Sequence, residues 1–140
     1  SASITNAIDR TVSEAVEAVA DQTSDMVATV MPVDLTELSH EELMTEGLQV
    51  YTTSCAACHQ ATGAGLPGAF PSLIGSPIIT GPVDEHIDIV RNGKPGTAMQ
   101  AFASSLSPRQ MAAVITYERN AWGNNSGDTV QATDVNSHGQ

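Results

Sequence analysis

Apolar residues recur every three or four positions through the first thirty residues of the chain. This stripe consists of Ile4, Ile8, Val12, Ala15, Val16, Val19, Met26, Val27 and Val30. The spacing predicts one long amphipathic helix, which Pro32 ends because proline cannot donate the next backbone hydrogen bond. Charged residues interrupt the stretch every few positions, so we expect no membrane span here.

The same periodicity predicts three further helices, over residues 39–52, 83–92 and 107–122. The first and third begin with capping boxes, in which a serine and the residue three positions later each accept a hydrogen bond from the other's backbone N–H. The pairs are Ser39 with Glu42 and Ser107 with Gln110. Gly47 lies inside the first of these helices, where glycine costs about 1 kcal/mol relative to alanine. Close packing against another helix would explain that glycine.

The other segments are rich in residues that break helices. Glycine and proline are frequent in residues 60–82 and 93–99, so we expect long loops there. Residues 124–140 are mostly small and polar, which predicts a frayed C-terminal tail. The expected organisation is a helix and connector over residues 1–40, a helical domain over 41–123, and this tail.

The chain has 140 residues and a formal net charge of −11, and this charge is unevenly distributed. Residues 1–46 hold ten acidic residues against Arg10 alone. Nucleic acid is excluded as a partner, because no basic stripe is present to displace counterions from phosphates. An anionic membrane surface is disfavoured for the same reason.

One short motif carries chemistry: Cys55-Ala56-Ala57-Cys58-His59. Two thiols at this spacing can add to the two vinyl groups of a porphyrin, and the adjacent imidazole can coordinate its iron. The motif therefore predicts one covalently attached haem c, with His59 as an iron ligand. A second haem is excluded because the chain contains only two cysteines.

Three other roles for these cysteines are less favourable. A structural zinc site needs four nitrogen or sulfur ligands, and no third cysteine exists to help complete one. A thioredoxin-like redox pair requires a βαβ context and would leave His59 without a role. A disulfide across two intervening residues would be strained and would constrain almost nothing.

The sixth iron ligand is expected to be Met99. It ends the glycine- and proline-rich segment 94–99, whereas the other four methionines fall in or at the end of predicted helices. A thioether is a soft ligand that suits haem iron and raises its potential. His86 is the alternative ligand, although its position suggests a half-exposed helix residue.

These residues resemble class I cytochrome c over residues 41–123. The likeness implies an all-α class I fold around one haem, in which Gly47 and Tyr51 meet the last helix near Val114 and Tyr117. It also implies that the carbonyl of Pro71 receives the Nδ1–H of His59, a bond that fixes the ring of a metal ligand. Met99 corresponds to the family's sixth ligand.

A narrower likeness lies in "RNGKPGTAMQAF" and "LSPRQMAAVITYERNAWGNN". Together with the loop after the haem motif, they resemble the cytochrome c domain fused to subunit II of some bacterial haem–copper oxidases. The chain departs from that subunit in lacking transmembrane helices and the copper-binding cysteine pair. This likeness implies single-electron transfer to or within a respiratory terminal oxidase, and no enzymatic activity of the domain itself.

Other functions are compatible with the same residues. The chain could be a free-standing periplasmic carrier for another redox enzyme, or a haem-bearing assembly or gas-binding module. Redox partners are expected to dock at an exposed, mostly uncharged haem edge. Arg91 and Lys94 are candidates to neutralise the haem propionates.

The sequence does not decide between several roles for the first 40 residues. The N-terminal stripe could pack on the haem domain, act as a solvated tether, or pair two copies of the chain into a homo-oligomer. The chain starts at Ser1 without a leader, so we expect any export signal to have been removed. Haem is joined to such motifs outside the cytoplasm, so the expected location is periplasmic or extracytoplasmic, with any membrane association made through a parent subunit.

Overall fold

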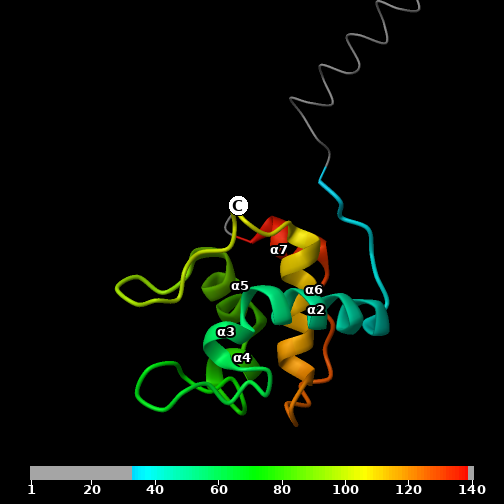
Figure 1. Ribbon diagram of the computed structural model, residues 1–140. Coiled ribbons are helices and arrows are strands. Elements are labelled where there is room, and N and C mark those ends of the chain that lie inside the picture. Colours follow the sequence, from blue (N-terminus) through cyan, green and yellow to red (C-terminus); the bar gives the residue numbers. More distant parts are fainter. Residues whose placement is uncertain (1–32, 139–140) are drawn as a thin grey trace, which may run out of the picture. The chain divides into compact units, whose positions relative to one another are not determined.

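Residues 33–138 are described by a computed structural model as helices joined by long loops (Figure 1). The helices are α2 (His40–Ser54), α3 (Ala56–His59), α4 (Pro77–Thr80), α5 (Val83–Asn92), α6 (Pro108–Asn120) and α7 (Ala132–Ser137). Within this range one isolated β-bridge, between Leu66 and Phe70, is the only strand-like pairing. The all-α prediction is therefore confirmed for the described residues, whereas the expected N-terminal helix lies outside them.

The two capping boxes form as the sequence predicts. The Ser39 hydroxyl accepts the backbone N–H of Glu42, and the Glu42 carboxylate accepts that of Ser39, both at 3.1 Å. The bond from the Ser39 backbone N–H to the charged carboxylate, followed by the contribution of the Ser39 side chain, holds the pKa of Glu42 below its usual value. Ser107 and Gln110 bond each other in the same way at the start of α6. Because the orphan N–H groups are satisfied, both helices begin at the expected residues.

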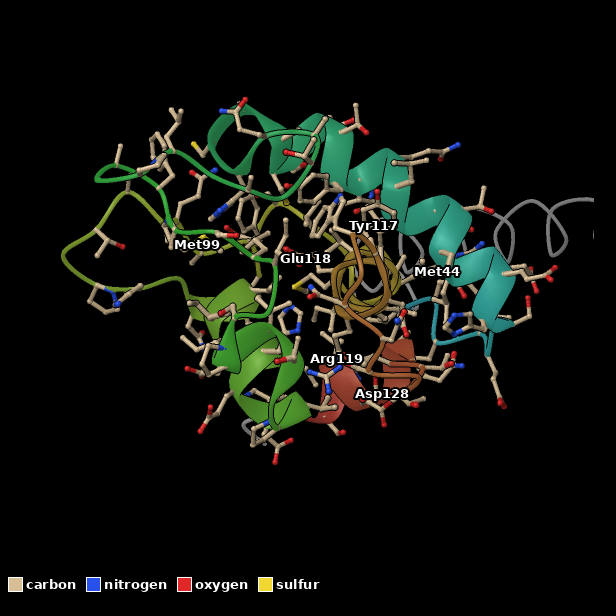
Figure 2. The ribbon with its side chains drawn as sticks, turned by 90° about the horizontal axis from the view of Figure 1, so that it is seen from below. Met44, Met99, Tyr117, Glu118, Arg119 and Asp128 are labelled. Atoms are coloured by element: carbon tan, nitrogen blue, oxygen red, sulfur yellow. The ribbon has the colours of Figure 1, made fainter. Side chains whose placement is uncertain are left out.

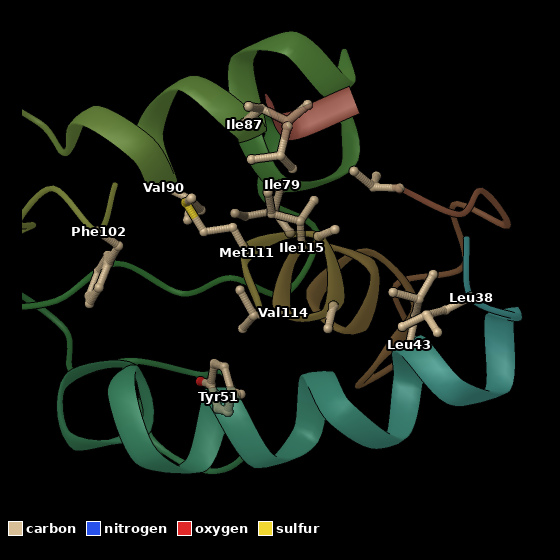
Figure 3. Close-up of a cluster of buried hydrophobic side chains, with 14 of the residues drawn as sticks. Leu38, Leu43, Tyr51, Ile79, Ile87, Val90, Phe102, Met111, Val114 and Ile115 are labelled. Atoms are coloured by element: carbon tan, nitrogen blue, oxygen red, sulfur yellow. The ribbon is translucent and has the colours of Figure 1, made fainter. Parts of the chain in front are cut away.

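Helix α6 is the centre of the domain. It makes its most extensive helix contact with α2, which crosses it at Gly47 (Figure 1). Figure 3 shows its buried side chains between those of α2 on one side and those of α5 on the other. The labelled core residues of the three helices are Leu43, Tyr51, Ile87, Val90, Met111, Val114 and Ile115.

The prediction of a frayed C-terminal tail was wrong. Residues 124–138 fold back along α6, where Val130 and Val135 are 1% and 0% exposed, and α7 packs against α6. The hydroxyl of Thr116 accepts the backbone N–H of Val130 at 3.0 Å and donates to its carbonyl at 3.2 Å. Burial of Val130, Ala132 and Val135, together with hydrogen bonds to α6, therefore accompanies an ordered segment whose composition alone suggested disorder.

The buried side chain of Arg119 links this segment to the end of α4. Arg119 is 4% exposed, and its guanidinium donates to the carboxylate of Asp128 and to the carbonyls of Ile79 and Gly81 (Figure 2). The hydrogen bond and charge of Arg119 lower the pKa of Asp128. The sequence pattern did not reveal this network, and it also indicated a loop over residues 76–82, where α4 forms one helical turn.

None of the helices in the described part of the chain is long and apolar enough to cross a membrane.

Candidate functional site

The motif cysteines open onto an apolar cavity of about 350 Å³. Its walls come from the end of α2, from α3, α4, α5 and α6, and from the loops before α4 and after α5. The residues on these walls that matter most to the chemistry are Cys55, Cys58, His59, Pro71, Lys94, Met99 and Glu118, among apolar side chains such as Phe70, Leu73, Ile79, Val90 and Val114. Tertiary structure thus brings Met99 to the same cavity as the motif, forty residues earlier in the chain.

The His59 ring is oriented by the backbone of the loop that follows it. Its Nδ1 lies 3.0 Å from the carbonyl oxygen of Pro71, and since a carbonyl can only accept, Nδ1 carries the proton. The neutral ring then has an unprotonated Nε2, which is the form that binds iron. The loop returns to this point because Gly65 takes a positive φ of 67° and its N–H bonds the carbonyl of His59 at 2.9 Å.

The two thiols lie at the first turn of α3. Cys55 and Cys58 are both partly exposed and unpaired with each other, and the backbone N–H of Cys58 bonds the carbonyl of Cys55 at 3.2 Å. Burial, followed by the nearby charge of Glu118, raises the pKa of the free Cys55 thiol to about 12. Within residues 33–138, no group of three His, Cys, Asp or Glu side chains is placed to hold a metal ion.

Met99 is presented by a loop that closes tightly on the end of α5. Gly93 ends that helix with a φ of 69°, and a Cβ there would lie 2.6 Å from the carbonyl oxygen of Met99. The Lys94 N–H bonds the same carbonyl at 3.0 Å. Only glycine combines this φ with so close an approach, so Gly93 sets where Met99 enters the cavity.

Two cations were expected near the haem, and the structure separates them. Lys94 lines the cavity. Arg91 does not: its Nη1 donates to the carbonyl oxygen of Val135 at 3.3 Å, holding α7 against α5. In this structure Arg91 therefore belongs to the packing of the C-terminal segment.

The burial of His86 and its contact with Glu118 were not predicted from the sequence. His86 was expected to be half exposed, but it is 0% exposed, and its Nε2 lies 3.3 Å from the Glu118 carboxylate. Met99 and Glu118 both line the cavity (Figure 2), whereas His86 does not. The helical pattern could have indicated the burial of His86, because it adjoins Ile87 on the apolar face of α5.

Aromatic and amide side chains fix the loop around the motif. Tyr51, Tyr117 and Trp122 form a cluster with ring centroids 4.9–5.6 Å apart, and the Trp122 indole donates to the carbonyl of Ala61 at 3.0 Å. Asn124, 4% exposed, bonds the carbonyl of Leu73 and the N–H of Gly75. The expected small-and-aromatic crossing of the helices is present, and Asn124 is an anchor that the polar sequence context concealed.

The residues around the cavity fit a haem. The lining is mostly apolar, as a porphyrin ring requires; two thiols lie at one edge, an imidazole offers its Nε2, and a thioether is available as a soft ligand. The all-helical fold and this constellation define a c-type cytochrome domain.

Comparison with known proteins agrees. Residues 42–117 match the family model described as "Cytochrome C oxidase, cbb3-type, subunit III", and the chain belongs to this family of cytochrome c domains. It therefore carries covalently bound haem c and transfers electrons rather than catalysing a reaction of its own.

Individual relatives are about one-third identical to this chain over the aligned positions. The cytochrome c subunit of a quinone alcohol dehydrogenase from Gluconobacter oxydans is 36% identical over an alignment of 99 residues that covers 64% of this chain and 21% of the relative. The cytochrome c subunit of gluconate 2-dehydrogenase from Pantoea cypripedii is 35% identical over 102 residues, 65% of this chain and 23% of the relative. Cytochrome c-552 of Thermus thermophilus is 31% identical over 93 residues, 56% of this chain and 69% of the relative. The chain thus spans only about a fifth of the dehydrogenase subunits.

Proposed function

We propose that this chain is a one-electron carrier whose haem iron is held by His59 and Met99. The observation that carries the proposal is the single cavity that brings both motif cysteines, His59 and Met99 together. Bound haem c supplies an iron that accepts and releases one electron. The chain contributes the two ligands, the Pro71 carbonyl that orients His59, and an apolar lining that keeps water from the ring.

The two ligands suit a carrier rather than a binding site for gases. With His59 and Met99 both bound, no coordination position is open to an external ligand, and the same ligands serve both oxidation states. The Gly93 turn and the Lys94–Met99 bond hold the methionine loop in place, so little needs to move when an electron arrives. Lys94 is the cation best placed to interact with a haem propionate, because it lines the cavity.

We propose further that the electron donor is a dehydrogenase. The names of two relatives support this, since they are cytochrome c subunits of dehydrogenases that act on an alcohol and on gluconate. Docking would take place near the cavity, whose lining includes the exposed side chain of Ile78. The setting proposed for this exchange is the periplasm or another extracytoplasmic space, where haem is joined to motifs of this kind.

An oxidase is the second candidate partner. Two observations favour it: the description of the matching family model as an oxidase subunit, and the resemblance of the Met99 loop and last helix to domains fused to oxidase subunit II. In this case the domain would pass electrons onward to a terminal oxidase. Homo-oligomer formation through residues 1–30 would be compatible with either partner, and the residues concerned lie outside the described part of the chain.

Stopped-flow mixing distinguishes the two partners. The oxidised holoprotein is mixed with a quinone-dependent alcohol dehydrogenase that lacks its own cytochrome subunit, and haem reduction is followed by visible absorption after alcohol is added. The reduced holoprotein is mixed in parallel with a haem–copper oxidase. Rapid, saturable reduction by the dehydrogenase is expected; slow reduction together with rapid oxidation by the oxidase would favour the second candidate.

A further inference from the structure

A buried carboxylate and a buried imidazole face each other beside the haem cavity. Glu118 of α6 lines the cavity and is 5% exposed, and His86 of α5 is completely buried. His86 Nε2 lies 3.3 Å from Glu118 Oε1. Neither residue attaches the haem or is proposed to bind iron, so the function described above leaves this pair without a role.

The pair has an unused proton-binding position. Among the side chains of residues 33–138, His86 Nδ1 is the only buried nitrogen or oxygen without a hydrogen-bond partner. Buried polar atoms normally find partners. With one proton on the imidazole and an ionised carboxylate, the pair carries one negative charge; a second proton makes it neutral. Two protonation states are therefore available without breaking the His86–Glu118 contact.

Among the described residues, the Glu118 carboxylate forms an ion pair with no side chain other than His86. Arg119, the next residue on α6, directs its guanidinium to Asp128 and to two backbone carbonyls. Tyr51 of α2 donates its hydroxyl to the carbonyl of Gln60, and α4 carries no titratable side chain. The acidic residues of α5 itself, Asp84, Glu85 and Asp88, are exposed to solvent.

The negative charge of Glu118 affects the Cys55 thiol, one of the two groups to which the haem is attached. Burial is the main reason that the pKa of the free Cys55 thiol is raised, and the negative charge of Glu118 is the next. The same two causes, in the same order, raise the pKa of Tyr51. Conversely, a positive charge on His86 is felt at Asp128, where it is a minor cause of the lowered pKa. Charges at the pair and at the cavity wall are therefore coupled through a poorly hydrated interior.

We propose that the Glu118–His86 pair takes up a proton when the haem is reduced and releases it when the haem is oxidised. This inference rests on the proposed function and deepens it. One electron enters the haem from the donor protein and one proton enters the pair from solvent; both leave on oxidation. Reduction adds a negative charge to the cavity, which disfavours the negative form of the pair and favours its neutral, protonated form. Glu118 is then a positioning residue that sets the potential through its charge.

The potential of the holoprotein tests this directly. Spectroelectrochemical titration between about pH 5 and pH 8, where histidine-containing sites change charge, should show a midpoint potential that falls as pH rises. A tenfold difference in proton affinity between the two oxidation states corresponds to about 59 mV for a one-electron couple. Glu118→Gln keeps the size of the side chain and removes its charge, so the potential should rise and lose this pH dependence. His86→Gln should lose it as well.

A matched control is provided by another histidine–carboxylate pair within residues 33–138. His138 Nε2 lies 3.6 Å from the Asp88 carboxylate, and neither residue lines the haem cavity. His138→Gln should retain the wild-type pH dependence of the potential. A potential that does not change with pH in the wild type, or a slope that persists in both Glu118→Gln and His86→Gln, would overturn the proposal.

The proton uptake can also be measured in the wild-type holoprotein, without any substitution. If the glutamine variants fail to incorporate haem, nuclear magnetic resonance of the wild-type holoprotein reports the protonation of His86 in each oxidation state. An identical titration of the pair in both states would refute the coupling. The proposed carrier function is tested separately. It requires reversible one-electron reduction and a methionine-ligated spectrum, both measured at a single pH.

Discussion

Gly47 of α2 lies directly against the backbone of Ala113 on α6. A Cβ added to Gly47 would collide with the Ala113 carbonyl oxygen and would lie 2.6 Å from Cβ of Tyr117. Two helix backbones can approach this closely only where a side chain is missing. The crossing in turn places Tyr51, one helical turn further along α2, against Tyr117 and Trp122. One glycine therefore determines how the helix before the haem motif meets the last long helix.

Gly47→Val should destabilise the domain by about 1–3 kcal/mol or more, because the added side chain has no space in this crossing. Thermal unfolding of the holoprotein, followed by circular dichroism, measures the effect. Leu48→Ala is the control, since Leu48 is the next residue on the helix and is 48% exposed. Equal melting temperatures for Gly47→Val and the control would show that the crossing tolerates a side chain.

Met99→Ala should leave the haem covalently attached and open one coordination position. The ferrous variant should then bind carbon monoxide readily, which visible absorption detects, whereas the wild type should bind it poorly. Met44→Ala is the matched control, because Met44 is a partly buried methionine of α2 that does not line the cavity. Unchanged spectra and no carbon monoxide binding in Met99→Ala would assign the sixth ligand to another residue.

Asp128→Asn should destabilise the protein at neutral pH by about 1–3 kcal/mol, a range reduced for the partial exposure of the carboxylate. The variant leaves the buried Arg119 without its anionic partner. Because the folded pKa of Asp128 is lowered, its contribution is complete above the unfolded value of about 3.9 and disappears as pH falls through the folded value. The stability difference from wild type should therefore shrink in acid.

Chemical denaturation at a series of pH values measures this difference. Asp88→Asn is a suitable control, because the Asp88 side chain is 61% exposed and should matter little at any pH. A stability gap between Asp128→Asn and wild type that stays constant into acid would contradict the ion-pair explanation.

Val135→Ala should cost about 1–3 kcal/mol of stability, the loss expected for removing two buried methyl groups and leaving space behind. Val135 lies on α7 and is 0% exposed, and its carbonyl oxygen accepts a hydrogen bond from the Arg91 guanidinium. Denaturant unfolding gives the free energy. Val33→Ala, at a position 51% exposed, is the same substitution in solvent and should be nearly neutral; equal effects would mean that α7 does not pack stably.

Features that depend only on residues close together in the sequence could be predicted from the sequence alone. A capping box needs only residues three positions apart, so the starts of α2 and α6 could be predicted from Ser39 with Glu42 and from Ser107 with Gln110. The haem motif is equally local, since Cys55, Cys58 and His59 lie within five consecutive positions. These residues alone are enough to predict haem c, because its attachment chemistry depends on their type and spacing.

Features that depend on distant contacts were decided only by the tertiary structure. The order of the C-terminal segment comes from Val130 and Val135 packing on α6, and a polar composition does not reveal where such contacts will form. Arg91 points to α7 rather than the cavity because a long side chain bonds whichever carbonyl the fold brings near it. His86 meets Glu118 across 32 positions of sequence. The charge environment of the haem cavity is therefore a property of how α5 packs against α6, which short-range pattern cannot specify.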